Sequence, residues 1–406
     1  MSYILAVNPL ILGETGMDKG ALFSATIVAA AIATLVMAFY AKLPFALASG
    51  MGLNAFFAYT FVLVMGYTWQ QALAAVFIEG VVFILLTVFK VREAIVNAIP
   101  LTLRYSISVG IGFFIAYIGL KNGGVIVADD STVTALGPWT ASSLLAIAGV
   151  LVAGALMFLH LRGALFYTII VMTIIGIPFG VTQIPEGFTF VSMPASMSSI
   201  AFHIDFSRFL ALDMEYYIAV FALLFMDIFD TLGTLIGVAT SAGMADPKTG
   251  RIHGLNRAMI ADAVGTTCGA LCGTNTVTTY VESATGIAAG GRTGLTSFTV
   301  ALLFLAALFF SPLFLMVPSA ATTSALVLVG VMMMRSILKI NFEDVTEVVP
   351  SFITIVMMPF TASISEGIVL GLLSYVLMKV MTGRYKEVSV VMYILAAFFV
   401  LKYIFN

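Results

Sequence analysis

The stretch LCGTNTVTTY, residues 271–280, interrupts the apolar segments on either side of it. It is rich in Gly, Asn, Thr and Val, which are poor helix formers. A second stretch, LASGMGLNAFF at residues 47–57, is also rich in Gly, Ser and Asn. Non-helical backbone is tolerated inside a membrane only where it is buried in protein or lines a cavity. We therefore predict two short extended pieces that pair with each other, each followed by a half-helix whose N–H groups point at a ligand.

The rest of the chain is apolar enough to place it in a lipid bilayer. Of 406 residues, 61% are hydrophobic and 9% are charged, and the mean hydropathy is +1.12. A soluble domain carries about 25% charged residues, so polar groups cannot cover this surface. The net charge of −2 argues against nucleic acid as a partner. Cys268 and Cys272 have no Cys or His companions in a ligand pattern, so we expect packing residues and neither a metal site nor a disulfide. No cofactor is expected.

Apolar segments follow one another with short breaks, and most are long enough to cross about 30 Å of hydrocarbon as helices. They lie at 1–12, 20–41, 46–65, 70–89, 101–120, 141–160, 164–181, 212–237, 256–270, 274–290, 295–316, 319–338, 350–363, 366–382 and 388–405. We predict an all-α integral membrane protein of about fourteen segments. The first run is too short to span, so either the first helix is half-length or the sequence lacks its natural start. The last run either lies along the surface or crosses once more.

Basic residues orient these segments. If the N-terminus is cytoplasmic, fourteen Lys and Arg residues fall in inward breaks and three in outward breaks, a strong positive-inside asymmetry. The inward set is Lys42, Lys90, Arg92, Arg104, Arg162, Lys248, Arg251, Arg257, Arg292, Arg335, Lys339, Lys379, Arg384 and Lys386, and the outward set is Lys19, Lys121 and Arg208. We therefore expect a plasma (inner) membrane protein with a cytoplasmic N-terminus.

Two parts of the chain resemble each other. Residues 15–35 are similar in order to residues 242–271, and residues 99–112 occupy the same relative place as residues 317–330. Because seven is odd, two sets of seven segments have opposite orientations in the membrane. This arrangement predicts the two inverted seven-segment repeats of a secondary transporter, with the two extended strands at mid-membrane.

The segment LFMDIFDTLGTLIG, residues 224–237, places carboxylates in the apolar interior. Asp227, Asp230, Thr231 and Thr234 fall at helical spacing and form one polar stripe. Buried acids in membranes are expensive and face the bundle interior or a cavity. A carboxyl that gains and loses a proton beside a ligand is what proton-coupled transport needs. A structural network with threonine and backbone partners is the alternative, and it is a stronger one for Asp227 alone.

Three further residues complete the predicted site. Glu282 and Ser283 follow the second broken segment, and Asn54 lies in the first. Glu79 and Asp262 are interpreted as braces between helices. The sequence has no GxxxxGK[ST] motif and no nucleophile elbow or HExxH motif, so neither an ATP-driven pump nor an enzyme is expected.

Several motifs resemble the purine permeases of the AzgA-like branch of the nucleobase–ascorbate transporter superfamily, which carry adenine, guanine or hypoxanthine. They are MSYILAVNPLIL, GMGLNAFFAY, DIFDTLGTLIGV, GTNTVTTYVESATGIAAGGRTGL and FEDVTEVVPSFITIVMMPFTASISEGI. The resemblance runs from residue 1 to about residue 385; that family normally has a longer first helix with a polar segment before it. It implies a uracil-permease-type fold and a homodimer. It also implies that Glu282, Asp227 and Asp230 contact the base and that Asn54 helps shape the site.

The resemblance also implies two domains, each assembled from two halves. Segments 1–4 (residues 1–98) and segments 8–11 (residues 212–317) would form a core domain. Segments 5–7 (residues 99–211) and segments 12–14 with the C-terminal helix (residues 318–406) would form a gate domain.

The expected function is import of purine nucleobases by a nucleobase:cation symporter, with Asn54, Asp227, Asp230, Thr234, Glu282 and Ser283 as substrate-binding residues. Asp230, Asp227 and Glu282 are the candidates for proton coupling, and the sequence leaves sodium open as the coupling ion. The alternatives are a same-fold carrier of uracil or xanthine, a sulfate-permease-like anion carrier, and a passive channel. Three acids argue against an anionic substrate.

Overall fold

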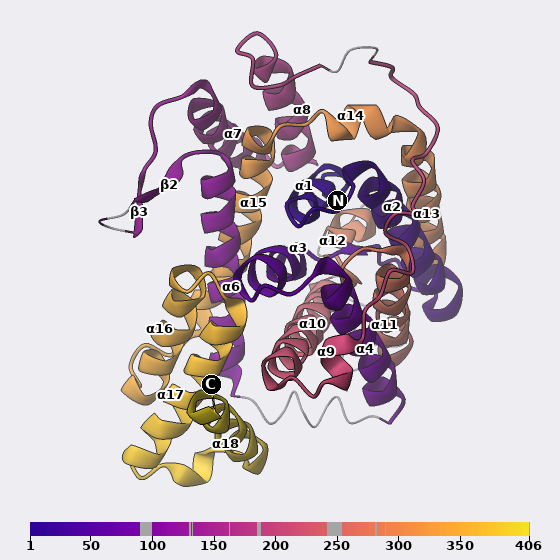
Figure 1. Cartoon of the computed structure of the whole chain (residues 1–406). Helices are drawn as coiled ribbons and strands as arrows, with labels where there is room; N and C mark the ends of the chain where they lie inside the picture. The colour runs from indigo at the N-terminus through magenta and orange to yellow at the C-terminus, as the bar shows by residue number, and fades with distance from the viewer. Residues whose placement is uncertain are drawn as a thin grey trace.

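The chain folds into helices that carry two small pairs of strands, as the computed structural model shows for residues 1–89, 100–129, 131, 133–161, 163–184, 188–241, 254–280, 282–288 and 290–405 (Figure 1). The first half contains α1 (Ile4–Gly13), α2 (Lys19–Val36), η1 (Met37–Ala41), β1 (Leu47–Ser49), α3 (Met51–Ala55), η2 (Phe56–Val64), α4 (Trp69–Val88), α6 (Leu101–Asn122), β2 (Ile126–Asp129), β3 (Val133–Leu136), α7 (Ala141–Phe158), α8 (Ala164–Gly176) and α9 (Ser207–Leu210). The second half contains α10 (Met214–Ser241), α11 (Leu255–Cys272), β4 (Val277–Thr279), α12 (Ser283–Ala288), α13 (Gly294–Ala307), η3 (Leu308–Phe310), α14 (Ser311–Leu315), α15 (Ser319–Met334), η4 (Arg335–Lys339), α16 (Val345–Phe360), α17 (Ile364–Met381), η5 (Tyr385–Glu387) and α18 (Val390–Phe405).

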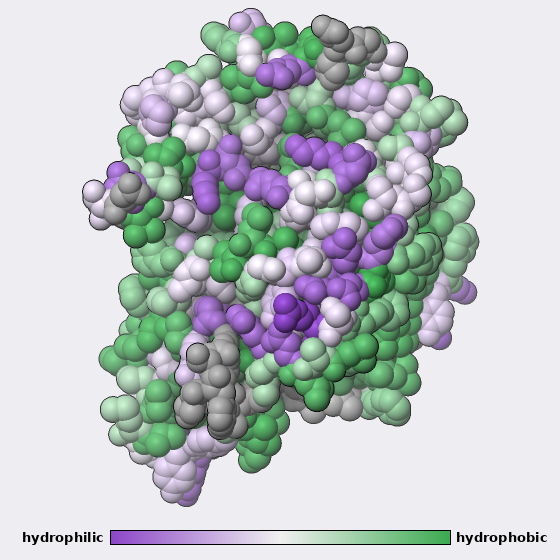
Figure 2. All heavy atoms as spheres, viewed as in Figure 1, coloured by the Kyte–Doolittle hydropathy of each residue, from purple (hydrophilic) through white to green (hydrophobic). Residues whose placement is uncertain are grey.

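The helices have the length and surface of membrane spans. Among the described residues, six are long and apolar enough to cross a bilayer: Lys19–Ala41, Trp69–Val88, Leu101–Asn122, Ala141–Phe158, Gly294–Leu315 and Ser319–Lys339. Large apolar side chains such as Leu151 on α7 and Leu303 on α13 are exposed on the outside of the bundle. Figure 2 shows hydrophobic residues over wide areas of the surface. Lipid contact accounts for this exposure, and the protein is an integral membrane protein.

The two broken segments pair as predicted. β1 and β4 run antiparallel, with Leu47 opposite Thr279, Ala48 opposite Thr278 and Ser49 opposite Val277. A half-helix follows each strand: α3 after β1, and α12 after β4. The strands bond to each other through alternate backbone groups, and the hydroxyls of Thr34 and Thr266 bind outward-facing groups of Leu47 and Val277, so this non-helical backbone finds its partners within the protein.

Other features were not predicted. A second antiparallel pair, β2 with β3, lies between α6 and α7. The half-helix α3 continues into η2, which is a π-helix. The C-terminal apolar run forms α18, which lies antiparallel to α17: Tyr403 binds Glu366 near one end of the pair, and Lys379 binds Glu387 near the other. Of the basic residues used for orientation, Lys90, Arg92, Arg162, Lys248 and Arg251 lie outside the described residues, as does part of the repeat at 242–271.

The helices pack in two groups. One contains α6, α7, α15, α16 and α17, and the other contains α1, α2, α4, α10, α11 and α13 (Figure 1). Small residues allow the closest approaches within each group. At the crossing of α6 and α15, a Cβ added at Gly330 would lie 2.3 Å from the carbonyl oxygen of Gly112. A Cβ added at Gly112 would lie 2.6 Å from the carbonyl oxygen of Gly330. Backbone faces backbone here, so neither helix can give way by moving a side chain.

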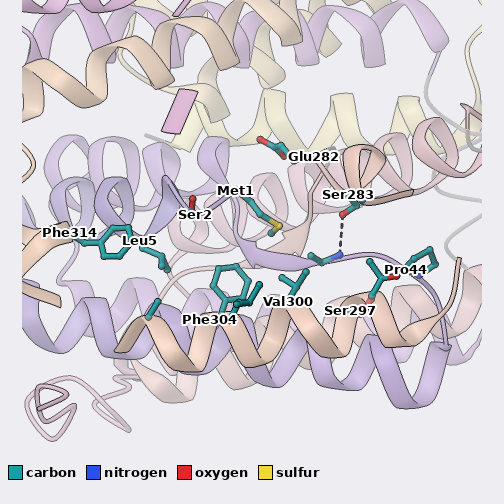
Figure 3. Close-up of a pocket in the computed structure, with 15 residues that line it drawn as sticks. Met1, Ser2, Leu5, Pro44, Glu282, Ser283, Ser297, Val300, Phe304 and Phe314 are labelled. Atoms are coloured by element: carbon teal, nitrogen blue, oxygen red, sulfur yellow. Dashed lines mark hydrogen bonds between the residues drawn. The ribbon is translucent and has the colours of Figure 1, made fainter. Parts of the chain in front are cut away.

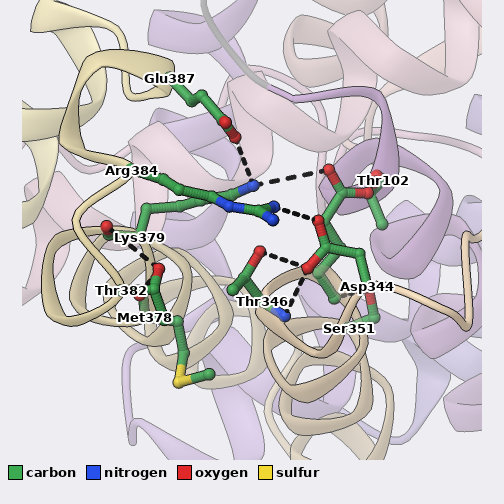
Figure 4. Close-up of polar contacts among 10 residues, drawn as sticks. Thr102, Asp344, Thr346, Ser351, Met378, Lys379, Thr382, Arg384 and Glu387 are labelled. Carbon is green, nitrogen blue, oxygen red and sulfur yellow. Dashed lines mark hydrogen bonds and ion pairs between the residues drawn. The ribbon is translucent and has the colours of Figure 1, made fainter.

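A polar network ties the ends of α6, α16 and α17 together (Figure 4). The Lys379 side chain is 1% exposed; its Nζ lies 2.6 Å from Glu387 Oε2 and 3.8 Å from Glu347 Oε1. Thr102, at the start of α6, donates to Glu347 Oε2 at 2.5 Å. Asp344 caps α16, and the Thr346 hydroxyl and backbone N–H, with Arg384, lower the pKa of Asp344 to about 2. Asp344 is therefore ionised at neutral pH, and its ion pair with Arg384 is kept.

We expect Gly330→Ala to lower the free energy of unfolding by about 1–3 kcal/mol, because the new methyl group would force α6 and α15 apart. Thermal unfolding in detergent measures the change. Gly154→Ala on α7 is the matched control, since a Cβ at Gly154 meets no atom within 4 Å. Equal stability of the two variants would contradict the close crossing.

We expect Glu387→Ala to destabilise the protein by about 2 kcal/mol, because the buried Lys379 ammonium would lose its closest partner. The double variant Lys379→Met with Glu387→Ala should recover much of the loss, since no buried charge would remain unpaired. The same unfolding measurement applies. A double variant as unstable as the single one would show that the ion pair is not the cause.

Candidate functional site

The site is built on the paired strands. The backbone N–H of Gly50 donates to the carbonyl oxygen of Thr276 at 3.0 Å, and the N–H of Tyr280 donates to Ala46 at 3.0 Å, so the pairing extends beyond both strands. The Tyr280 hydroxyl donates to the carbonyl oxygen of Ser49 at 2.5 Å. These bonds fix where α3 and α12 begin. The paired strands therefore hold the first-turn N–H groups of both half-helices in place.

Asn54 lies on α3, one turn after the first strand. It is fully buried, and neither its Nδ2 nor its Oδ1 has a hydrogen-bond partner among the described residues. A buried amide with two open donors and an open acceptor is costly unless something else satisfies it. Asn54 is therefore placed and equipped to bind a polar ligand.

Glu282 and Ser283 mark the start of α12. Glu282 is half-buried and its Oε1 accepts from the Tyr3 hydroxyl at 2.6 Å. The Ser283 hydroxyl oxygen accepts from the backbone N–H of Ala46 at 3.0 Å (Figure 3). Ser283 thus ties the second half-helix to the segment before β1, whereas Glu282 presents a carboxyl group to the neighbouring phenols.

The two aspartates of α10 have different surroundings. Asp230 Oδ2 lies 3.4 Å from the Thr278 hydroxyl, and the Asp230 carboxyl is close enough to Glu282 for their charges to interact. Asp227 is fully buried, and its Oδ1 lies 3.1 Å from the Thr231 hydroxyl. The structure therefore places Asp230 and Glu282 within electrostatic range of each other, while Asp227 belongs to a separate network.

That network continues behind the strand. The Thr231 hydroxyl lies 2.8 Å from Asp262 Oδ2, and Thr279 donates to Asp262 Oδ1 at 3.1 Å. Adjacent residues of a strand project to opposite faces, so Thr278 and Thr279 place Asp230 and Asp262 on opposite sides of β4. Thr234 is buried one turn further along α10. The predicted bracing role of Asp262 is confirmed by these contacts.

Sequence reasoning missed three contributors. Tyr3 and Tyr280 place their phenols where the charges of both Glu282 and Asp230 act on them. Asn8, fully buried on α1, donates from Nδ2 to Thr26 at 2.6 Å and to Thr274 at 2.9 Å. An amide in an otherwise apolar helix was the available signal for Asn8. Tyr3 lies far from Glu282 in sequence, and only the fold brings the two together.

A cavity of about 310 Å³ lies beside this site, between α1, α12 and α13 (Figure 3). Apolar side chains such as Leu5, Val300 and Phe304 line most of it. Glu282 is at its edge, away from Val300 and Phe304 (Figure 3). Neither Asn54 nor Asp230 lines it. The cavity therefore adjoins the polar site and does not contain it.

This chain is similar in sequence to bacterial permeases and in fold to a solved transporter. Adenine permease AdeQ of Escherichia coli (strain K12) is 44% identical over 405 residues, which cover 100% of this chain and 90% of that protein. Guanine/hypoxanthine permease PbuO of Bacillus subtilis (strain 168) is 40% identical, over 98% of this chain and 93% of that protein. The transmembrane domain of the cyanobacterial bicarbonate transporter BicA has a similar fold: TM-score 0.66, 18% identity, 91% of this chain and 94% of that one.

The low identity to BicA limits that comparison to the fold. The family assignment comes from sequence: the model of the Permease family Xan_ur_permease matches residues 1–370. Members of this family are transporters and not enzymes. The chain therefore belongs to the Xan_ur_permease family of permeases.

Proposed function

We propose that this protein imports purine nucleobases (adenine, guanine or hypoxanthine) coupled to protons. The observation that carries the proposal is that the Asp230 and Glu282 carboxyls lie within electrostatic range of each other beside the paired strands, with the open amide of Asn54 on the half-helix after the first strand. The names of the related adenine and guanine/hypoxanthine permeases support the substrate class.

The chemistry of the site suits a purine. A purine is a flat, neutral ring that presents N–H donors and N or O acceptors on its edges. A carboxylate accepts such N–H groups, and an amide both donates and accepts. Charge-assisted bonds in a dry pocket are about twice as strong as neutral ones. In this proposal Glu282 and Asp230 accept from the base, Asn54 completes its edge, and Asp227, Thr234 and Ser283 shape the remaining wall.

Coupling follows from the same carboxyl groups. Asp230 has a hydroxyl neighbour in Thr278, which donates to the carboxylate and accepts from the protonated acid. We propose that its proton enters with the base while a core (residues 1–98 and 212–317) moves against a gate (residues 99–211 and 318–406) in alternating access. The division between residues 98 and 99 lies outside the described residues. An inner-membrane homodimer with cytoplasmic N-termini and two inverted repeats completes this proposal.

The experiment that tests the function is uptake of labelled purines by a transport-deficient cell. Unlabelled adenine, guanine and hypoxanthine should compete, whereas uracil, xanthine and sulfate should not. Competition by uracil or xanthine would indicate a carrier of another nucleobase, and competition by sulfate would indicate an anion carrier. Uptake that is insensitive to a proton ionophore would exclude proton coupling; replacing sodium with choline tests the other cation.

We expect Glu282→Gln to weaken purine binding about tenfold to a hundredfold, because the change removes a charge-assisted acceptor worth roughly 1.5–3 kcal/mol. Equilibrium binding to purified protein measures this. Glu343→Gln, at an exposed carboxyl outside the site, is the control. Unchanged affinity in Glu282→Gln would remove Glu282 from the binding site.

We expect Asp230→Asn to abolish proton-driven accumulation while keeping part of the purine binding and exchange, because the amide mimics the protonated acid. Asp227→Asn should impair both more mildly. Proton flux during purine entry into proteoliposomes is the measurement. If Asp230→Asn protein still concentrates purine under an imposed proton gradient, another carboxyl carries the proton.

A further inference from the structure

A third acid, Glu79, lies near the middle of α4 and touches neither Glu282 nor Asp230 in any described contact. It is fully buried, and the Thr276 hydroxyl donates to its Oε2 at 2.7 Å. Its neighbour Gly80 lets α4 approach α11 closely, since a Cβ there would lie 2.5 Å from Thr267 Oγ1. Tight helix packing therefore holds Glu79 at the entry to β4.

The second oxygen of Glu79 faces another acid. Glu79 Oε1 is buried with no hydrogen-bond donor among the described residues, and the carboxyl of Asp227 lies within hydrogen-bonding reach of Glu79. Two ionised carboxylates are both acceptors and repel each other, so a bond between them requires one proton. Of the described groups that act on the charge of Glu79, Asp227 and Asp262 are carboxyls and none is a cation.

The neighbouring hydroxyls cannot supply that proton. The single proton of Thr231 is shared between Asp227 Oδ1 and Asp262 Oδ2, which lie 3.1 and 2.8 Å away. Thr276 is already committed to Glu79 Oε2. Neither of these two hydroxyls therefore has a proton left for the contact between Glu79 and Asp227.

We propose that Glu79 is a positioning residue that shares one resident proton with Asp227 and so clamps the entry of β4 between α4 and α10. This shared proton is distinct from the transported proton that we assign to Asp230. The Asp230 residue is only half-buried, whereas Glu79 is fully buried. The inference rests on the proposed function in naming a purine as the ligand of the positioned groups and Asp230 as the carrier of the transported proton.

The clamp acts on the binding site through the backbone. Thr276, held by Glu79, accepts from the N–H of Gly50 at the start of α3. Thr279, at the other end of β4, is held by Asp262. Glu79 and Asp262 therefore fix the two ends of the strand whose middle residue, Thr278, contacts Asp230.

The test compares Glu79→Gln with Glu79→Leu. A glutamine can accept from Thr276 and donate to Asp227, so it replaces the protonated acid; a leucine can do neither. We expect Glu79→Gln to keep purine affinity within about threefold and to keep the pH profile of uptake. Glu79→Leu should lose roughly tenfold or more in affinity, because the buried Thr276 hydroxyl would lose its acceptor and Asp227 would lose its contact with position 79. If Glu79→Leu does not fold, Thr276→Val with Thr276→Ser as its rescue makes the same comparison.

Infrared spectroscopy of the purified, substrate-free protein tests the proton itself. The carbonyl band of a buried protonated carboxylic acid should be present in the wild type and in the Glu343→Gln control, and reduced in Glu79→Gln. An unchanged band in Glu79→Gln would overturn the shared proton. If Glu79→Gln binds purine normally but loses proton-driven accumulation, the proton on Glu79 is transported, which would overturn the proposal that it stays bound. Because the infrared measurement uses no purine, it stands even if the transported substrate is different.

Discussion

Backbone polar groups have no water to bind inside a bilayer, and this constraint shapes the centre of the protein. A chain that leaves the helical path at this depth must satisfy its N–H and C=O groups from another segment. β1 and β4 do this for each other across more than two hundred residues of sequence, with Leu47 opposite Thr279. Because the two strands are paired, the half-helices α3 and α12 that follow them begin on either side of the same strand pair. The proposed binding site, with backbone donors and with Asn54 and Glu282 beside them, depends on this pairing.

The same lack of water governs the acids. A carboxylate in a dry interior needs donors, and the site supplies mostly threonine hydroxyls and phenols: Thr278 for Asp230, Tyr3 for Glu282 and Thr276 for Glu79. Hydroxyl groups both donate and accept, so they support a carboxyl before and after it binds a proton. An arginine or lysine partner would instead hold the carboxyl ionised. Neutral partners therefore suit the change of protonation that the proposed coupling requires.

Composition and local sequence pattern were sufficient to predict the helices and the two broken segments, because these depend on residues that are close in sequence. The apolar runs predicted the helices, and the Gly, Ser and Asn content of 47–57 and the Thr-rich composition of 271–280 predicted the strands that pair. Spacing placed Asp227 and Asp230 on one stripe, but it could not separate their surroundings, because Thr278 and Thr231 reach them from different directions. The contacts of Tyr3 with Glu282 and of Glu79 with Thr276 link distant segments, and no local pattern encodes them. The β2–β3 hairpin is short and partly exposed, so it leaves little periodic signal.

The C-terminal helix α18 contacts both groups of helices, through α17 in one and α10 in the other. α18 is fastened to α17 near both of its ends, yet the ring of its Phe399 packs edge-on against Phe221 of α10, with 6.1 Å between ring centroids. Phe399 is almost fully buried, so its ring is an interior contact between the groups. Because α18 is bound to α17, a displacement of α10 along α17 would also move the Phe221 ring relative to the Phe399 ring. α18 therefore adds an aromatic contact to the direct packing of α10 against α17, and any relative movement of the two groups would have to shift both.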